Sequence, residues 1–175
     1  MFERYLASQV KADLGRKMVF LGGPRQVGKT TLAKSLLGAC EAGYLNWDVT
    51  ADRERLLKEE LPPGLLWAFD ELHKYRGWRN FLKGLYDGRR EGQKILVTGS
   101  ARLDFYRFAG DSLQGRYHYL RLHPLSAAEL KMKKNSELRE LLERGGFPEP
   151  FFARSAIEAK RWSREYRARL LRDDL

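Results

Sequence analysis

The sequence predicts an α/β protein in which a parallel sheet carries helices on both faces. Before Pro124, short apolar runs alternate with stretches whose apolar residues recur at helical spacing, an order that is typical of parallel sheets. One run, residues 65–69, is apolar at every position, as expected of a strand that is covered on both sides. After Pro124 the pattern indicates helices only. We therefore expect a core at residues 1–124 and a small helical part at residues 125–175.

The expected core contains five strands and the helices between them. Apolar residues at helical spacing predict a first helix up to Leu14, and Gly15 ends it. Strands are expected at residues 17–22, 44–48, 65–69, 94–98 and 117–122. Helices are expected at residues 29–37, 50–57 and 78–90, and a further helical stretch precedes the fifth strand.

In the helical part, Ser126 and Glu129 have the spacing of a capping box, which predicts that a helix begins there. A second helix is expected at about residues 136–144. Residues 145–150, rich in glycine and proline, interrupt the pattern, and a basic helix is expected over residues 155–172.

Composition limits the class of protein. A chain of 175 residues, 43% of them hydrophobic, can form one main domain with a substantial core. The single Cys40 excludes an internal disulfide and favours a reducing compartment. The first residues do not resemble a signal peptide, and no apolar run is long enough to cross a membrane. We expect a cytoplasmic protein with no membrane partner.

The net charge of +10 has two interpretations. Nucleic acid is one expected partner of so basic a chain. Alternatively, the arginines serve bound phosphates, contacts between subunits or a partner domain. No basic stripe interleaved with aromatic residues supports the first interpretation over the second.

Residues 23–30 read Gly-Pro-Arg-Gln-Val-Gly-Lys-Thr and lie between an expected strand and an expected helix. The two glycines allow a turn in which consecutive backbone N–H groups face a phosphate. Lys29 adds a cation for the β- and γ-phosphates, and the Thr30 hydroxyl can ligate magnesium. The pattern predicts a nucleoside triphosphate site lined by Gly23, Pro24, Arg25, Gln26, Val27, Gly28, Lys29, Thr30 and Thr31. Whether Arg25 covers the nucleotide or faces water stays open.

Two acids, Asp70 and Glu71, end the expected third strand. In magnesium-dependent hydrolysis of a nucleoside triphosphate, the first acid holds the metal through water and the second orients the attacking water. An ordinary helix N-cap is the alternative. Because a phosphate-binding loop precedes these acids, we interpret Asp70 as a metal-binding residue and Glu71 as a catalytic one.

A hydroxyl group at the end of the fourth strand is a candidate sensor of the γ-phosphate, and Thr98 and Ser100 are equal candidates. Arg102 lies just beyond them and can face phosphate or solvent. Arg116 directly precedes the fifth strand. It is a candidate arginine finger for the nucleotide of a neighbouring subunit, and a surface arginine is the alternative.

Taken together, these blocks resemble the AAA+ ATPases of the archaeal and bacterial AAA_14 type. The resemblance rests on the loop at residues 23–31 and on six further blocks, at residues 45–48, 69–75, 98–104, 110–117, 122–126 and 145–150. It implies a P-loop core with strand order 5-1-4-3-2, a helical lid and ATP as the nucleotide. It also implies that Lys29 and Thr30 form Walker A, that Asp70 and Glu71 form Walker B, and that Pro148 approaches the base.

Members of this family usually continue into a long C-terminal domain of unassigned function (DUF4143), whereas this sequence ends at Leu175. We therefore expect a partner domain or protein that is missing here, and the basic last helix is a candidate contact surface for it. A second copy of the chain is another expected partner.

The leading hypothesis is an ATP-binding switch with slow, magnesium-dependent hydrolysis. The first alternative is a regulator in which ATP gates an arginine-rich surface for nucleic acid. The second is a small-molecule kinase, against which the paired acids argue.

Overall fold

The computed structural model describes residues 3–38, 41–99 and 113–173 of the chain. These residues fall into two compact units, a core unit at residues 1–122 and a helical unit at residues 123–175. The candidate site lies in the core unit, and the two units are described separately below.

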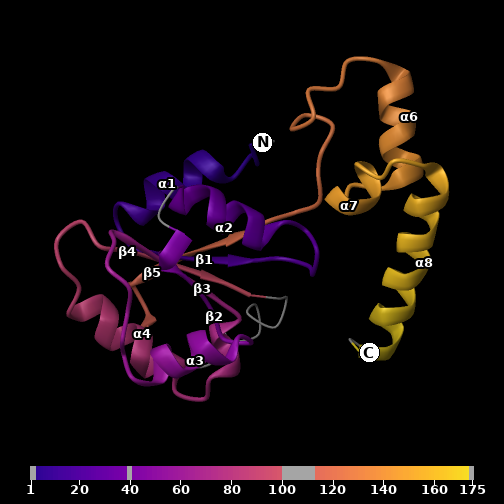
Figure 1. Ribbon diagram of the computed structural model, residues 1–175. Coiled ribbons are helices and arrows are strands. Elements are labelled where there is room, and N and C mark those ends of the chain that lie inside the picture. Colours follow the sequence, from indigo (N-terminus) through magenta and orange to yellow (C-terminus); the bar gives the residue numbers. More distant parts are fainter. Residues whose placement is uncertain (1–2, 39–40, 100–112, 174–175) are drawn as a thin grey trace. The chain divides into compact units, whose positions relative to one another are not determined.

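The core unit contains a five-stranded sheet in which every pair of neighbouring strands is parallel. The strand order is β2-β3-β4-β1-β5, which confirms the order that the resemblance implied (Figure 1). The strands are β1 (Met18–Gly22), β2 (Tyr44–Asn46), β3 (Leu66–Asp70), β4 (Lys94–Thr98) and β5 (Tyr117–Arg121). Their carboxyl ends lie at one edge of the sheet, and a ligand site is expected at such an edge.

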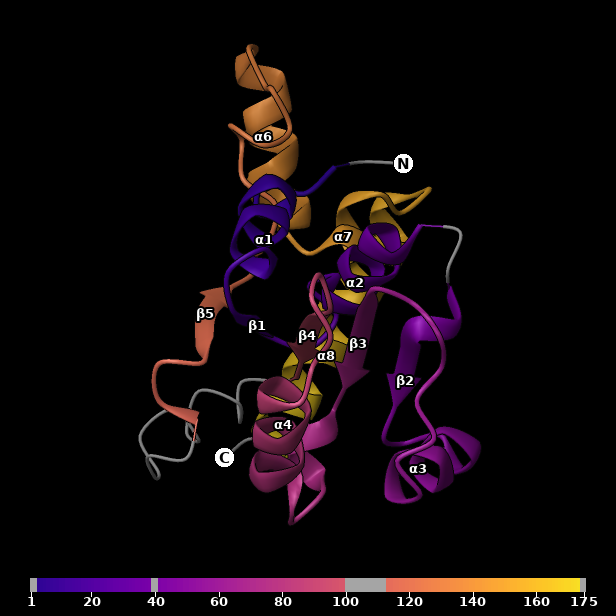
Figure 2. The same ribbon diagram turned by 90° about the vertical axis from the view of Figure 1, so that its left-hand side faces the viewer.

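Helices cover both faces of this sheet, so the expected three-layer arrangement is confirmed (Figure 1). The first face carries α1 (Ala7–Leu14) and α2 (Lys29–Leu37). The other face carries α3 (Thr50–Leu57) and α4 (Trp78–Asp87), as the turned view also shows (Figure 2). Among the described residues, the short 3₁₀ segment η1 (Glu41–Gly43) precedes β2, and η2 (Leu72–Lys74) follows β3.

The strand register brings polar residues to one level of the sheet. Strand β1 is buried along its whole length, and β4 is buried at every position after Lys94. At their carboxyl ends Leu21 lies opposite Thr98, Thr98 lies opposite Asp70, and Asp70 lies opposite Asn46. Three neighbouring strands therefore present polar side chains at the same height, next to the loop that follows β1.

The helical unit contains α6 (Asn135–Arg144), α7 (Pro148–Phe151) and α8 (Ala156–Asp173). The rings of Phe147, Trp162 and Tyr166 form a cluster with centroids 4.7–5.1 Å apart, and this cluster ties the segment before α7 to α8. The expectation of a helix at Ser126 was wrong, because residues 127–131 form a turn. Lys131 has a φ of 54°, in the left-handed region, which ends the helical hydrogen-bond pattern after one turn.

Candidate nucleotide-binding site

The loop between β1 and α2 has positive φ angles at three positions. Gly23 and Gly28 have φ values of 142° and 97°, which explains why glycine stands at both positions. Gln26 also has a positive φ of 63°, a conformation that costs energy and recurs at ligand sites. Since α2 begins at Lys29, the unpaired N–H groups of its first turn lie next to the loop.

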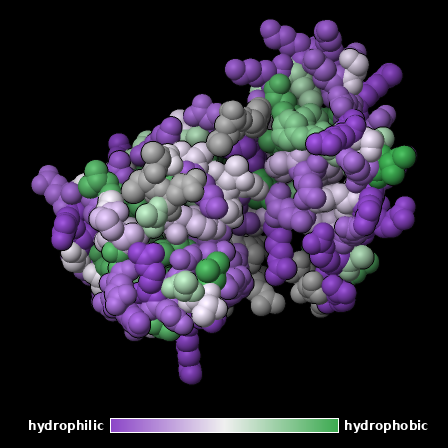
Figure 3. All heavy atoms as spheres, viewed as in Figure 1, coloured by the Kyte–Doolittle hydropathy of each residue, from purple (hydrophilic) through white to green (hydrophobic). Residues whose placement is uncertain are grey.

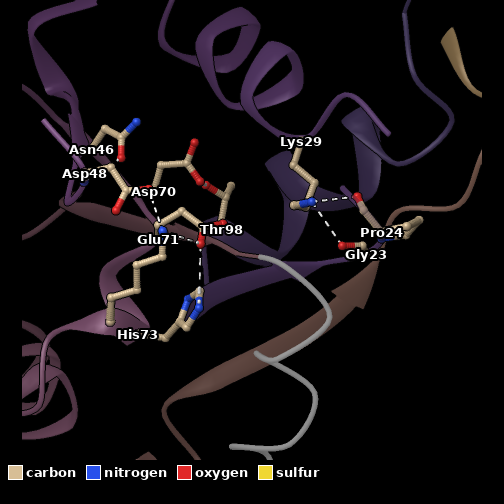
Figure 4. A network of polar contacts seen from close by, with 10 residues as sticks. Gly23, Pro24, Lys29, Asn46, Asp48, Asp70, Glu71, His73 and Thr98 are labelled. Carbon is tan, nitrogen blue, oxygen red and sulfur yellow. Dashed lines mark hydrogen bonds and ion pairs between the residues drawn. The ribbon is translucent and has the colours of Figure 1, made fainter. Parts of the chain in front are cut away.

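Lys29 lies over this loop and is only 8% exposed. Its Nζ donates hydrogen bonds to the carbonyl oxygens of Gly23 at 3.0 Å and Pro24 at 2.8 Å (Figure 4). Burial lowers the pKa of Lys29, although the charges of Glu71 and Asp70 oppose the shift. A phosphate beside this ammonium would stabilise its charged form.

The Asp70 carboxylate is held by hydroxyl groups from three different elements. Its Oδ2 accepts hydrogen bonds from Thr30 of α2 at 2.8 Å and from Tyr44 of β2 at 2.5 Å. Its Oδ1 accepts one from Thr98 of β4 at 2.6 Å. This carboxylate is 6% exposed and Thr98 is fully buried. An oriented carboxylate beside a hydroxyl supplies the hard oxygen ligands that Mg²⁺ prefers, so the residues fit the metal that the family implies.

Tyr44 is a site residue that the sequence analysis missed. It lies two residues before Asn46 on β2, so both side chains emerge on the same face of the strand. This two-residue spacing was the sequence signal that could have identified Tyr44 as a site residue. Burial and the hydrogen bond to Asp70 raise the pKa of the Tyr44 phenol, which therefore keeps its proton and its role as donor.

Replacing Tyr44 with Phe is expected to lower the magnesium concentration that half-saturates nucleotide binding, by roughly 10- to 100-fold. The change removes a donor that occupies the Asp70 oxygen also bonded to Thr30, and a net hydrogen bond to a charged group is worth roughly 1.5–3 kcal/mol. Magnesium titrations at fixed ATP measure the effect. Tyr86→Phe is the matched control, because Tyr86 lies at the far end of the sheet beside β4. A lower half-saturating magnesium concentration in both variants, or in neither, would contradict this role for Tyr44.

Glu71 begins a tight turn at the end of β3 and has a φ of 55°. Its backbone N–H donates to the Thr98 carbonyl at 2.9 Å, which fixes where the turn starts. Its Oε2 lies 3.7 Å from His73 Nε2 and 3.4 Å from Lys74 Nζ (Figure 4). Lys74 also donates to Asp48 at 2.5 Å. Burial lowers the pKa of Lys74, but the bond to Asp48 and the charge of Glu71 outweigh it and raise the pKa.

Arg4 is a second residue that the sequence analysis missed. It is 8% exposed, and its Nη1 donates to the carbonyl of Val27 in the phosphate loop at 2.5 Å. The segment before α1 therefore stabilises the phosphate loop through a hydrogen bond to its backbone. No local pattern in the sequence pointed to it, because the contact spans 23 positions.

The structure brings the predicted residues Lys29, Thr30, Asp70, Glu71 and Thr98 to one edge of the sheet. The side chains of Arg25, Gln26, Thr30 and Thr31 are exposed along the loop and the start of α2. For Thr98, contact with a γ-phosphate stays a prediction, because its hydroxyl here donates to Asp70.

Three other predicted groups do not lie at this edge or cannot be placed there. Arg116 lies at the amino end of β5, one strand length or about 17 Å from the carboxyl ends, and forms a bidentate ion pair with Asp87 at 2.9 and 3.1 Å. Pro148 is the first residue of α7 in the helical unit. Ser100 and Arg102 lie outside the described residues. The arginine finger and the lid contact therefore stay predictions.

No helix in the described ranges is long and apolar enough to cross a membrane.

Comparison with solved structures supports the same fold as the strand order does. The Thermotoga maritima RuvB Holliday junction branch migration motor matches with a TM-score of 0.52 at 18% identity, covering 95% of this chain and 62% of that chain. A variant of the same motor matches with a TM-score of 0.53 at 17% identity and the same coverage.

Two curated relatives are similar in sequence, an uncharacterized protein of Mycobacterium bovis and one of Mycobacterium tuberculosis. Each is 31% identical over 177 aligned residues, which cover 98% of this chain. The chain spans 39% of the length of either relative. A family model described as an AAA domain, AAA_14, matches residues 15–131. The P-loop sheet, the loop geometry and this match agree: the chain belongs to the AAA_14 family of AAA domains and is a nucleotide-binding AAA+ module.

Proposed function

We propose that this chain binds magnesium-ATP at the phosphate loop and hydrolyses it slowly. The observation that carries the proposal is the Asp70 carboxylate, which accepts hydrogen bonds from Thr30 of the loop helix and from Thr98 of β4. Thr30 and Asp70 would supply oxygen ligands to a magnesium ion here, next to the phosphate oxygens of the nucleotide. AAA+ family membership supports ATP as the nucleotide.

Each residue has a distinct role in this proposal. The loop amides and Lys29 bind the β- and γ-phosphates, while Thr30 and Asp70 would hold the metal. A bound magnesium ion supplies charge neutralisation at the phosphate oxygens. Glu71 orients the attacking water and receives its proton, and Thr98 keeps Asp70 in position. Because Lys74 lies 3.4 Å from Glu71, it restrains this carboxylate before the nucleotide binds.

The output of hydrolysis is a movement of the helical unit that acts on a partner. This part of the proposal rests on the division of the chain into two units and on the greater length of its relatives. Pro148 is the first residue of α7, and we propose that it contacts the adenine base of the bound ATP. Arg116 is proposed to act in the site of a second copy, which requires that its ion pair with Asp87 opens.

Calorimetry with ATP and magnesium, followed by a phosphate-release assay, tests the proposal on the chain itself. We expect micromolar binding that is strengthened by magnesium, and release of phosphate well below about 1 s⁻¹, the slow end of typical enzyme turnover. Binding without release would mean that Arg116 of a second copy or a partner completes the site. A chain that binds neither ATP nor ADP would overturn the proposal.

A further inference from the structure

A second polar cavity lies at the opposite edge of the sheet from the phosphate loop. It has a volume of about 370 Å³ and is lined by residues 14–18, 86 and 89–95. Met18 and Lys94 are the first residues of β1 and β4, so the cavity lies at the amino ends of these strands. We call it the amino-edge cavity. Hydrophilic side chains project from this end of the core unit, at the left of Figure 3.

The lining of the amino-edge cavity is strongly basic. It includes a single acidic residue, Glu91, against five basic ones, Arg16, Lys17, Arg89, Arg90 and Lys94. Five basic residues and one acidic residue give this lining a formal net charge of +4. The guanidinium of Arg89 lies 3.5 Å from the centroid of the Tyr86 ring, which holds it at the cavity. Such a concentration of one sign of charge attracts anions.

One residue that lines the cavity, Gln93, carries a buried hydrogen-bond donor without an acceptor among the described residues. Gln93 is 8% exposed, and its Nε2 has no hydrogen-bond partner in the described part of the chain. Buried amide groups in folded proteins are almost always paired, because an unpaired one is costly. The Gln93 amide therefore points to an acceptor that these residues do not supply.

We infer that the amino-edge cavity binds the phosphate backbone of a nucleic acid. The charged groups favour an extended polyanion over a small free phosphate. Arg16, Arg89, Arg90 and Lys94 are exposed and lie on the rim, whereas the buried polar group is the uncharged Gln93. A strand that runs past the rim meets several cations, and a phosphate that enters the cavity can accept from the Gln93 amide once that buried side chain turns toward it. The site is separate from the phosphate loop, because the two lie at opposite ends of β1.

The test measures binding of fluorescein-labelled duplex and single-stranded DNA oligonucleotides to the chain by anisotropy, without ATP and over about 50–200 mM salt. Arg90→Ala/Lys94→Ala removes two rim cations. Arg164→Ala/Arg169→Ala is the matched control, because it removes two exposed cations from α8. We expect the cavity variant to reduce the log–log salt slope by about 1.8, so that its loss of affinity over this range is roughly tenfold smaller. At low salt it should bind roughly tenfold more weakly than the control.

Gln93→Leu separates a binding role from a structural one. It keeps the approximate volume of the side chain and removes the unpaired donor, so the unfolding temperature should stay equal or rise. DNA affinity should nevertheless fall by roughly 3- to 10-fold at every salt concentration. Unchanged DNA affinity in this variant would contradict a phosphate contact inside the cavity.

Three results would overturn the inference. They are no DNA binding by the unmodified chain, an equal loss in the two double variants, and Gln93-dependent binding of pyrophosphate without binding of DNA. The last result would assign the cavity to a small phosphorylated ligand. All these variants should bind ATP like the unmodified chain. A negative result for DNA binding would therefore not contradict the proposed ATP site.

Discussion

Replacing Glu71 with Gln is expected to reduce ATP turnover by roughly 10²- to 10⁴-fold while ATP binding stays within a few-fold of the unmodified chain. The amide keeps the size of the side chain but cannot accept the proton of the attacking water. It also loses the charge that attracts Lys74 Nζ at 3.4 Å and His73 Nε2 at 3.7 Å. Binding should survive, because the proposed phosphate and metal contacts belong to Lys29, Thr30 and Asp70. Phosphate release under single-turnover conditions measures the change in the chemical step.

Glu54→Gln is the matched control, since Glu54 is exposed on α3. It should leave both binding and turnover unchanged. If Glu71→Gln retained full turnover, another group would orient the water. A parallel loss of ATP affinity and turnover would instead mean that Glu71 supports the shape of the site and not the reaction.

Replacing Lys29 with Ala is expected to weaken ATP binding by roughly 10²-fold or more, because a buried, hydrogen-bonded charge partner of the phosphates is removed. Folding should change little. Burial lowers the pKa of this lysine, which means that the fold without nucleotide disfavours its charge. Its two hydrogen bonds go to the carbonyl oxygens of Gly23 and Pro24 in the same loop, so their loss should not separate distant parts of the fold. Calorimetry gives the affinity, and thermal unfolding gives the stability.

Ligand-induced stabilisation supplies a second readout for Lys29→Ala. A ligand at 100 times its dissociation constant stabilises the folded state by about 2.7 kcal/mol. ATP should therefore raise the unfolding temperature of the unmodified chain and of the exposed control Lys11→Ala, but not that of Lys29→Ala. An undiminished shift in Lys29→Ala would place the nucleotide somewhere other than the phosphate loop.

Local sequence signals were sufficient for the order of elements and for the loop. The sequence pattern located all five strands to within two residues at each end. For β1, β3 and β4 the signal was an apolar run, because a buried parallel strand needs apolar side chains on both faces. The spacing of Gly23, Gly28 and Lys29 predicted a loop whose glycines do have positive φ. The same reasoning was wrong at Ser126, where a capping pattern was not followed by a helix, because Lys131 has a left-handed conformation.

The contacts around Asp70 show what local signals cannot supply. Its position after an apolar strand indicated a metal ligand, but its donors come from residues that are 26 to 40 positions away. Tyr44 reaches Asp70 only because β2 pairs with β3 in one register, and a slip of one residue would turn its side chain to the other face.

By itself, then, the sequence determined the fold class, the phosphate loop and the acids, since turn chemistry and apolar spacing are properties of neighbouring residues. The tertiary structure decided which side chains converge on them. The bond from Arg4 to Val27, the restraint of Glu71 by Lys74 and the basic amino-edge cavity all depend on how elements pack. Gln93 and Met18 line the same hollow although 75 positions separate them, because parallel strands bring their amino ends to one edge of the sheet.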